Sequence, residues 1–160
     1  MALLRSTQYV LGDQTTRKTL ESTYTAGNIS TGFKTGNAVQ GFVDIEYTAG
    51  AAETLNSIQV KFEFSDSIVG SADVQNHIPA AASTEWYQET TEAVSAGTIT
   101  ETLAERTFAQ VSAAATYDRF RIALPLGHGY TRISIKETGV AANKGSASVK
   151  VTMIEQESIN

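Results

Sequence analysis

The chain has 160 residues, of which 41% are hydrophobic and 18% charged, and it carries a net charge of −5. A chain of this length buries about two thirds of its surface on folding, so its core requires neither disulfides nor a metal. It contains no cysteine, which excludes disulfide scaffolds, cysteine-based zinc modules and thiol catalysis. No apolar run reaches the ~18 residues of a membrane span, and residues 1–6 lack the features of a signal peptide. We therefore expect no membrane partner and no export from the cytoplasm.

The acidic total conceals an uneven distribution of charge along the chain. Residues 1–40 carry a net charge of +2, residues 41–118 a net charge of −10, and residues 119–160 a net charge of +3. An acidic composition is unusual for a nucleic-acid-binding protein, so we expect no nucleic-acid partner. Two interpretations of the distribution are open. The basic ends pair with the acidic middle inside one domain, or complementary faces meet between the subunits of an assembly.

The first 38 residues differ from the rest of the chain in their weak periodicity. They are rich in Thr, Gly and Asn, and only Tyr9, Val10 and Leu11 resemble a strand. We predict an extended N-terminal arm, residues 1–38, ahead of a single domain, residues 39–160. The predicted partner interface is formed by Tyr9, Val10 and Leu11, because a short apolar strand can extend the sheet edge of a neighbouring subunit.

From residue 39 onward, apolar and polar residues alternate with the period of two that is typical of half-buried strands. The apolar positions of the predicted strands are Val43, Ile45 and Tyr47; Ile58, Val60, Phe62 and Phe64; Phe120, Ile122 and Leu124; Ile133 and Ile135; and Ala147, Val149, Val151 and Met153. Two weaker strands are predicted around Trp86 and over residues 98–103. Turn residues separate these segments. The chain is therefore predicted to be all-β, an antiparallel, jelly-roll-like β-sandwich of seven or eight strands.

One stretch fits two kinds of secondary structure. Leu103, Thr107, Phe108 and Val111 recur at roughly helical spacing among good helix formers. The same stretch also contains a possible strand over residues 106–111. The pattern leaves both alternatives open.

A search for catalytic, cofactor-binding and metal-ligating patterns finds none. Residues 27–35 approach a phosphate-binding loop, but Phe33 separates the second glycine from the lysine that has to follow it directly. His77 and His128 lie in loop settings without the spacing of a metal site. The chain contains no Gly-x-Ser-x-Gly elbow. We therefore predict that the protein is not an enzyme, with no catalytic residue, no cofactor and no metal.

Trp86 and Tyr87 form the one aromatic pair that has a possible ligand-binding role. Flat aromatic rings on an exposed sheet face suit carbohydrate rings, so the two residues are a candidate platform for a sugar. A single tryptophan beside a strand is also a common core residue. Both interpretations of Trp86 remain open at this point.

The order of features in the second half of the chain resembles a known class of proteins. A strand that ends in Phe-Glu-Phe-Ser-Asp-Ser (residues 62–67) is followed by Trp-Tyr-Gln-Glu (86–89), Tyr-Asp-Arg-Phe-Arg-Ile (117–122), Leu-Pro-Leu (124–126) and Tyr-Thr-Arg-Ile-Ser-Ile-Lys-Glu (130–137). This order is similar to that of the small β-sandwich structural proteins of tailed bacteriophage virions, which serve as capsid decoration, head-accessory or tail components.

The resemblance implies a non-enzymatic virion protein, made in the host cytoplasm, that stabilises subunit junctions. Its implied partners are other copies of itself, with a trimer as the expected homo-oligomer, and a major capsid or other virion protein. Two alternatives stand beside this prediction. One is a carbohydrate-binding or adhesion module that uses Trp86 and Tyr87, and the other is a structural component of the phage tail.

Overall fold

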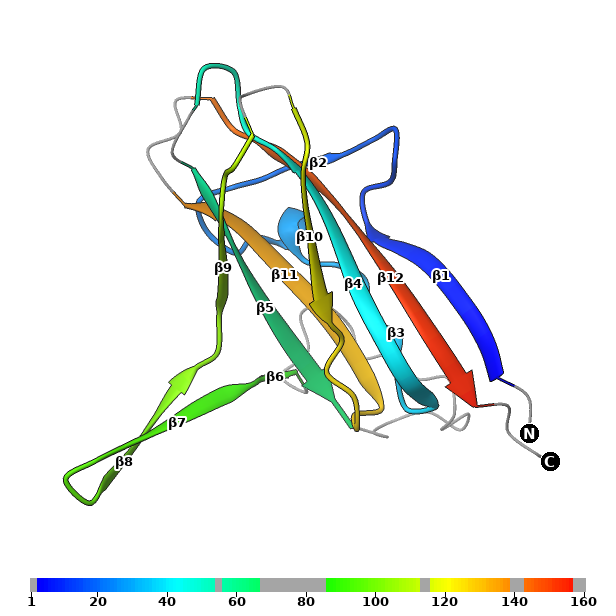
Figure 1. Ribbon diagram of the computed structural model, residues 1–160, viewed down its shortest axis with the longest axis vertical. Coiled ribbons are helices and arrows are strands. Elements are labelled where there is room, and N and C mark those ends of the chain that lie inside the picture. Colours follow the sequence, from blue (N-terminus) through cyan, green and yellow to red (C-terminus); the bar gives the residue numbers. More distant parts are fainter. Residues whose placement is uncertain (1–2, 54–55, 67–85, 113–115, 139–142, 157–160) are drawn as a thin grey trace.

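The structure is a computed structural model that describes residues 3–53, 56–66, 86–112, 116–138 and 143–156. Two five-stranded antiparallel sheets pack face to face, and a two-stranded hairpin projects from one end of them (Figure 1). The described residues contain no α-helix; a single 3₁₀ turn, η1 (Ala26–Asn28), lies beside the sheets. The prediction of an all-β protein with packed antiparallel sheets is confirmed.

The first sheet, called here the β4 sheet, contains the two ends of the chain. Its main strands lie in the order β1 (Leu3–Leu11), β12 (Ser146–Gln156), β4 (Ala38–Thr48) and β10 (Asp118–Ala123). The two-residue strand β2 (Lys18–Thr19) pairs with the beginning of β12. β1 and β10 are therefore the edge strands of this sheet.

The second sheet, called here the β5 sheet, packs against the first. Its strands lie in the order β3 (Phe33–Lys34), β11 (Tyr130–Thr138), β5 (Ser57–Ser65) and β6 (Tyr87–Gln88). A further strand, β9 (Arg106–Ala109), pairs with the same edge of β5 as β6 does, but nearer the beginning of β5. β5 and β11 form the centre of this sheet.

The hydrophobic core lies between the sheets and follows the predicted alternation. A side chain points to the opposite face of the sheet at each step along a strand, so every second residue of a half-buried strand meets the core. The core contains Val43, Ile45 and Tyr47 of β4; Val149, Val151 and Met153 of β12; Ile58, Val60, Phe62 and Phe64 of β5; and Ile133 and Ile135 of β11. These are the apolar positions that the period of two predicts.

The N-terminal residues belong to this sandwich. β1 pairs with β12 along its whole length, from Leu3 opposite Gln156 to Leu11 opposite Val149. Val10 and Leu11 are buried in the core, and so are Leu20 and Phe33 farther along the segment. The described part of residues 1–38 is thus an integral part of the domain rather than a separate arm. Its periodicity is weak because it crosses from one sheet to the other and forms only short edge pairings after β1.

The stretch with two alternatives forms a strand. Arg106–Ala109 pairs with β5, with Phe108 opposite Ile58. The pairing ends where the backbone N–H of Gln110 donates to the carbonyl of Asn56. The helical spacing is overridden because the free edge of β5 offers backbone partners for an extended chain.

We expect substitutions at the two ends of β1 to differ sharply in their effect on stability. Leu11→Ala should lower the free energy of unfolding by about 2–5 kcal/mol, because it leaves a cavity in a close-packed core. Leu3→Ala is the matched control, because Leu3 is exposed, and it should change that free energy by no more than about 0.5 kcal/mol. Denaturant titration measures both values. A Leu11→Ala variant as stable as the wild type would contradict the placement of β1.

Candidate functional site

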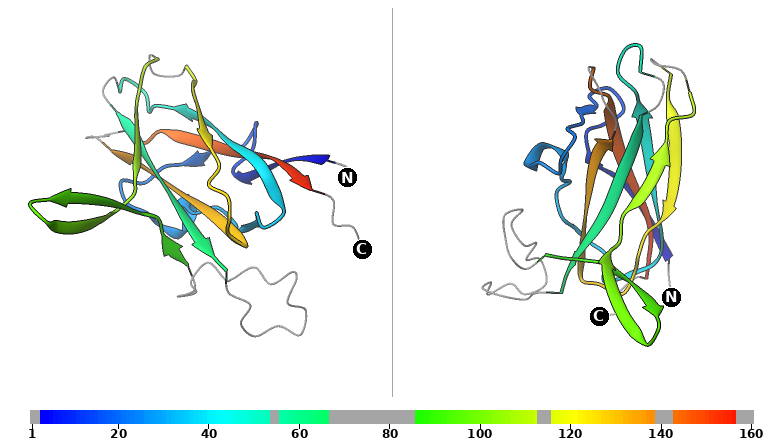
Figure 2. Two further views of the ribbon diagram at one scale, coloured as in Figure 1. Left: turned by 60° about the horizontal axis from the view of Figure 1, so that its bottom comes forward. Right: turned by 90° about the vertical axis from the view of Figure 1, so that its left-hand side faces the viewer.

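A hairpin interrupts the edge strand of the β5 sheet and projects away from the sandwich (Figure 2). Gln88 lies opposite Glu63, and Arg106 lies opposite Val60. Val60 and Glu63 are three residues apart on β5, whereas their partners Arg106 and Gln88 are eighteen residues apart. Fifteen residues of the facing chain therefore leave the sheet at this point. Most of them form β7 (Thr90–Ser95) and β8 (Thr98–Leu103), which pair with each other.

The base of the hairpin is held firmly on the sandwich. The backbone N–H of Ala104 donates to the carbonyl of Glu89 at 2.8 Å, and the Gln88 side chain donates to the carbonyl of Ala104 at 3.0 Å. Arg106 forms an ion pair with Glu89 at 3.2 Å, and its guanidinium lies 4.9 Å from the centre of the Phe62 ring. These contacts direct the hairpin away from the body of the protein.

The tip of the hairpin has the backbone that a tight turn requires. Ala96 and Gly97 have φ angles of 49° and 80°. Positive φ at both central residues is the mark of the type I′ turn, whose twist matches that of the two flanking strands. Gly97 adopts this conformation without strain, whereas alanine rarely does. All residues of β7 and β8 are exposed, so no other described segment covers the hairpin.

The two faces of the hairpin have different chemistry. One face carries the pairs Val94–Ile99 and Glu92–Glu101, with Leu103 beside them, and the opposite face carries only Thr, Ser and Ala. Val94, Ile99 and Leu103 are 71%, 64% and 63% exposed. We call the face with these five residues the acidic–apolar face.

The acidic–apolar face lowers the stability of the hairpin in an isolated chain. A two-stranded hairpin is only marginally stable by itself in water, and two like charges directly opposite each other weaken it further. Glu92 and Glu101 form such a pair in the middle of this face. A surface with these properties is typical of a segment that a partner covers.

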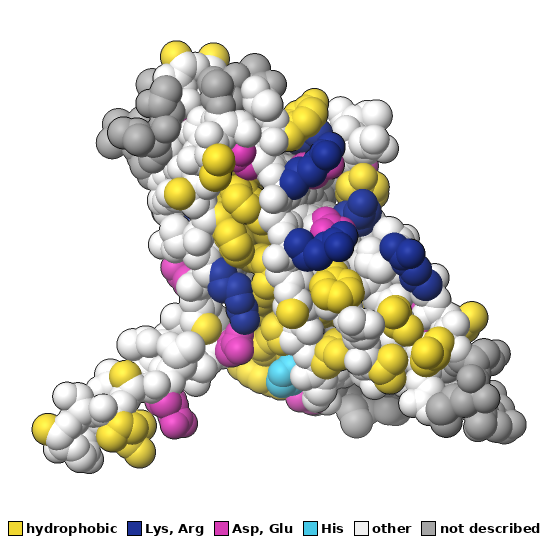
Figure 3. Space-filling model, viewed as in Figure 1, with side chains coloured by type: hydrophobic (Ala, Val, Ile, Leu, Met, Phe, Trp, Pro, Cys, Tyr) yellow, Lys and Arg dark blue, Asp and Glu magenta, His cyan; other side chains and the backbone are white. Residues whose placement is uncertain are grey.

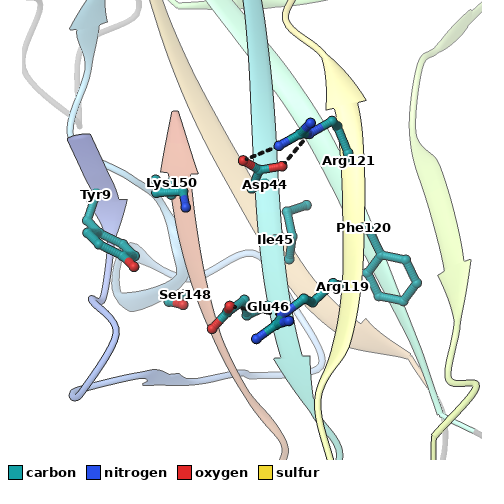
Figure 4. A pocket seen from close by; sticks show the side chains of 9 residues that line it. All are labelled: Tyr9, Asp44, Ile45, Glu46, Arg119, Phe120, Arg121, Ser148 and Lys150. Carbon is teal, nitrogen blue, oxygen red and sulfur yellow. Dashed lines mark hydrogen bonds and ion pairs between the residues drawn. The ribbon is translucent and has the colours of Figure 1, made fainter. Parts of the chain in front are cut away.

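A second unusual surface is the outer face of the β4 sheet, which carries most of the basic side chains visible in Figure 3. The chain is acidic overall, but this face has more basic than acidic groups. Two shallow hollows of about 250 Å³ each lie on it, and Figure 4 shows the one at its centre that Tyr9 lines. Their charged lining residues are Arg5, Asp44, Glu46, Arg119, Arg121 and Lys150. We call this surface the cationic face.

The acidic groups of the cationic face are already engaged within the chain. Arg121 contacts Asp44 through two hydrogen bonds of 2.6 and 3.1 Å (Figure 4), which, with the charges of Arg121 and Lys150, hold the pKa of Asp44 below its usual range. Glu46 accepts hydrogen bonds from Arg119 and Arg17. Arg5 and Lys150 form no ion pair within the described part of the chain.

The outer face of the β5 sheet differs because its charges are matched by the chain itself. Arg132 forms a buried, two-pronged ion pair with Glu63 at 2.9 and 3.2 Å, and Ser134 donates to the same carboxylate. The ring of Tyr24 lies 4.8 Å from the ammonium group of Lys61 and 4.5 Å from that of Lys136. The charges of these four ionised side chains are therefore matched by contacts within the chain.

The charge distribution along the sequence can now be compared with the ion pairs. Those that join the basic ends to the acidic middle are Arg17–Glu46, Arg119–Glu46, Arg121–Asp44, Arg132–Glu63 and Lys136–Glu105. The first interpretation, pairing inside one domain, is thus correct for these residues. Glu92 and Glu101 on the hairpin have no such partner in the described chain.

The residues of the predicted partner interface lie in different environments. Val10 and Leu11 are buried in the core of their own chain. Tyr9 is 41% exposed and lines one hollow of the cationic face, opposite Lys150 (Figure 4). Of these three residues, only Tyr9 therefore has a side chain that a partner can contact.

Trp86 and Tyr87 do not form one flat surface. Trp86 is 9% exposed, and the guanidinium of Arg132 lies 4.7 Å from its ring centre. Tyr87 is 46% exposed, and its hydroxyl donates to Asp66 at 2.6 Å and lies 3.1 Å from His128 Nδ1. Consecutive residues of an extended chain point to opposite sides, so the sequence neighbours have separate surroundings.

The cluster around Tyr87 joins residues that are far apart in the sequence. The His128 ring stacks on Phe64 at 4.0 Å between centres. Desolvation and the hydrogen bond to Asp66 raise the pKa of Tyr87 to about 12. The hydrogen bond from Tyr87, with others from Gly129 and His128, holds the pKa of Asp66 below its usual range. Sequence analysis missed this cluster because no local spacing connects its members.

The glycine-rich stretch 27–35 is part of the sandwich edge. Phe33 is buried in the core, Ile29 forms a bridge to Ser134, and the Thr35 hydroxyl donates to the carbonyl of His128. His77 lies outside the described residues. Among the described residues, no group of three or more His, Asp or Glu side chains is arranged to hold a metal ion. Nor do these residues include an apolar helix of membrane-spanning length.

Comparison with known proteins provides no assignment: no family model, curated protein or solved structure matches the chain. The hairpin and the cationic face are both open, extended surfaces of the described chain.

We expect the buried Glu63–Arg132 pair to be required for stability. Glu63→Gln should lower the free energy of unfolding by about 3–5 kcal/mol, because it removes the carboxylate that pairs with the buried Arg132 guanidinium and accepts a hydrogen bond from Ser134. Asp44→Asn is the matched control. It breaks a pair whose arginine is exposed and should cost about 1 kcal/mol or less. Equal effects of the two substitutions in denaturant titrations would contradict this expectation.

The same pair should also affect the dependence of stability on pH. Burial opposes ionisation of Glu63, but hydrogen bonds from Arg132 and Ser134 and the charge of Lys61 outweigh it and hold its pKa below the usual value of 4.5. The unfolded chain therefore binds a proton more readily, so the stabilisation is complete above about pH 5 and is lost as the pH falls through the folded pKa. Unfolding free energies measured between pH 3 and 6 should fall more steeply in the wild type than in Glu63→Gln. Parallel curves would show that Glu63 does not contribute.

We expect the fluorescence of Trp86, the single tryptophan, to be that of a buried indole. Its emission maximum should lie at shorter wavelength than in the guanidinium-unfolded chain, and acrylamide should quench it weakly, because the ring is packed under Arg132. A panel of soluble glycans should leave the emission unchanged. A shift that saturates with a glycan would instead support the carbohydrate-binding alternative.

Proposed function

We propose that this protein is a non-enzymatic structural subunit of a phage virion, a capsid decoration or head-accessory protein that stabilises subunit junctions. The observation that carries the proposal is the exposed acidic–apolar face of the β7–β8 hairpin. The virion setting comes from the resemblance in residues 57–153. A structural component of the phage tail is the alternative that the same features allow.

The connectivity supports a jelly-roll fold for this subunit. Apart from β2, β6 and the projecting hairpin, eight strands remain, and they are β1, β3, β4, β5, β9, β10, β11 and β12. Numbered one to eight along the chain, they lie in the orders 1-8-3-6 and 2-7-4-5 in the two sheets. Two interleaved four-stranded sheets of eight strands are the architecture of the double Greek-key jelly roll, which is common in viral capsid proteins.

The proposed mechanism is mechanical. Complete burial of a Val, Leu or Ile side chain contributes about 1.5–3 kcal/mol, so Val94, Ile99 and Leu103 together supply several kcal/mol at one contact. Part of this free energy offsets the loss of translational and rotational freedom on association. The contact is repeated at every junction of a symmetric array, so a modest contribution per subunit accumulates over the particle.

The proposed partners are other copies of the chain, with a trimer as the expected oligomer, and a major capsid or other virion protein. Tyr9 on the edge strand β1 lies at the rim of the sandwich. It is the one residue of the predicted N-terminal interface whose side chain is accessible to a partner. Neither a cofactor nor nucleic acid has a part in this proposal.

We expect removal of the hairpin to abolish self-association and leave the sandwich folded. Residues 90–103 are replaced by Asn-Gly, because Glu89 and Ala104 already lie at the hydrogen-bonding distance that a two-residue β-turn needs. Light scattering should report an oligomer for the wild type and a monomer for the variant, with similar melting temperatures. An oligomeric variant, or a monomeric wild type, would contradict the proposed role.

Point substitutions provide a matched test on the two faces of the hairpin. Val94→Ser with Ile99→Ser removes the apolar pair and should also yield a monomer. Ala93→Ser with Thr100→Ser alters the neighbouring pair on the opposite face and should leave the solution mass unchanged. Equal effects of the two double variants would show that the acidic–apolar face is not the contact surface.

A further inference from the structure

We propose that the hairpin of one copy docks on the cationic face of a second copy of this chain, in a head-to-tail contact. The inference rests on the proposed function, because it names the receptor of the hairpin. Four observations support it. The two surfaces are opposite in charge, both carry apolar side chains between the charges, their dimensions match, and they lie on different sides of the molecule.

Opposite charge is the first property. Between Thr90 and Leu103 the hairpin has two charged residues, Glu92 and Glu101, and no lysine or arginine. On the cationic face, Arg5 and Lys150 lack an ion-pair partner in the described chain. The hairpin thus presents negative charge only, and the cationic face has more basic than acidic side chains, so the two surfaces are complementary in charge.

The basic side chains of the cationic face would also relieve a repulsion that destabilises the free hairpin. Glu92 and Glu101 repel each other across the strand pair. A basic side chain placed between them removes that repulsion and supplies hydrogen bonds to both carboxylates. A second acidic surface, or a purely apolar one, would leave the two carboxylates repelling each other or buried without partners.

The apolar side chains alternate with the charges on both surfaces. On the hairpin, Val94 and Ile99 lie on one side of the glutamate pair, and Leu103 lies on the other side. On the cationic face, the hollows include Tyr9, Phe42 and Ile154 beside the basic residues. Contact between the surfaces therefore pairs charges with charges and buries apolar groups around them, as in the anchors of stable interfaces.

The dimensions of the two surfaces agree. Strands of six residues, such as β7 and β8, are about 20 Å long, and strands of eleven residues, such as β4 and β12, are about 36 Å long. Four strands of the β4 sheet span about 15 Å between the edge-strand axes, wider than a strand pair. The hairpin can thus lie along the sheet face without overhanging it.

The geometry makes the contact intermolecular. The hairpin projects from the end of the sandwich and points away from the β4 sheet (Figures 1 and 2), so it does not fold back on the cationic face of its own chain. Because the hairpin and the cationic face are different surfaces, each copy makes two contacts, one as donor and one as receptor. Such a heterologous contact closes into a ring or continues as an open array.

Charge reversal tests the proposal. One variant combines Glu92→Lys with Glu101→Lys on the hairpin, and the other combines Arg5→Glu with Lys150→Glu on the cationic face. Each variant alone should fail to assemble, with a dissociation constant at least about 100-fold higher than that of the wild type, because like charges now face each other. Mixed in equal amounts, the two variants should assemble again, since each reversed hairpin meets a reversed face and each native hairpin a native face.

A matched control separates the specific contact from the effect of net charge. Lys18→Glu with Lys34→Glu makes the same change in charge as the reversal of the cationic face, at exposed residues of β2 and β3. This control should keep the wild-type mass in light scattering. Circular dichroism and melting temperatures of all variants identify any that fail to fold.

The outcomes distinguish this inference from the proposed function. Recovery of assembly in the mixture supports head-to-tail docking. If removal of the hairpin abolishes assembly but reversal of the cationic face does not, the hairpin binds elsewhere, and the inference is overturned while the proposed function stands. Assembly that persists without the hairpin overturns both. A mixture of two folded variants that stays monomeric also overturns the inference.

Discussion

The burial of two apolar strand faces against each other is the interaction on which the rest of the structure depends. The inward side chains of β4 and β12 meet those of β5 and β11, and strand alternation then directs every second side chain outward. Charges consequently lie on the outer faces of both sheets. On the outer face of the β5 sheet, the rings of Tyr24 and Trp86 lie against Lys61, Lys136 and Arg132. On the cationic face, Arg5 and Lys150 have no ion-pair partner among the described residues.

The position of the hairpin follows from the same sheet order. It interrupts a strand that pairs only with β5, at an edge of the sheet, so leaving the sheet breaks one ladder of hydrogen bonds. An insertion into a central strand would break two. The sandwich is thus complete without the hairpin, which is free to carry an acidic–apolar face that contributes nothing to the fold of its own chain.

The candidate site was only partly predictable from the sequence. The sequence predicts a weak strand over residues 98–103. Their exposure arises because fifteen residues leave the sheet between β6 and β9, and no local sequence pattern indicates this. Tyr9, Val10 and Leu11 are predicted to extend the sheet edge of a neighbouring subunit, but Val10 and Leu11 are buried in the core of their own chain, because sequence does not say which sheet edge a strand will join. Trp86 and Tyr87 were adjacent in sequence and treated as one surface, although strand alternation separates them.

The sequence by itself determined the all-β class and the core, because the period of two decides which side chains can be buried together. It also determined the excess of acid in the middle of the chain and of base at its ends. Only the tertiary structure decided which charges are neutralised within one chain and which remain on the surface. That outcome depends on strand order, since Asp44 meets Arg121 across β4 and β10, while Glu92 and Glu101 lie on a projecting hairpin and form no ion pair with any described residue.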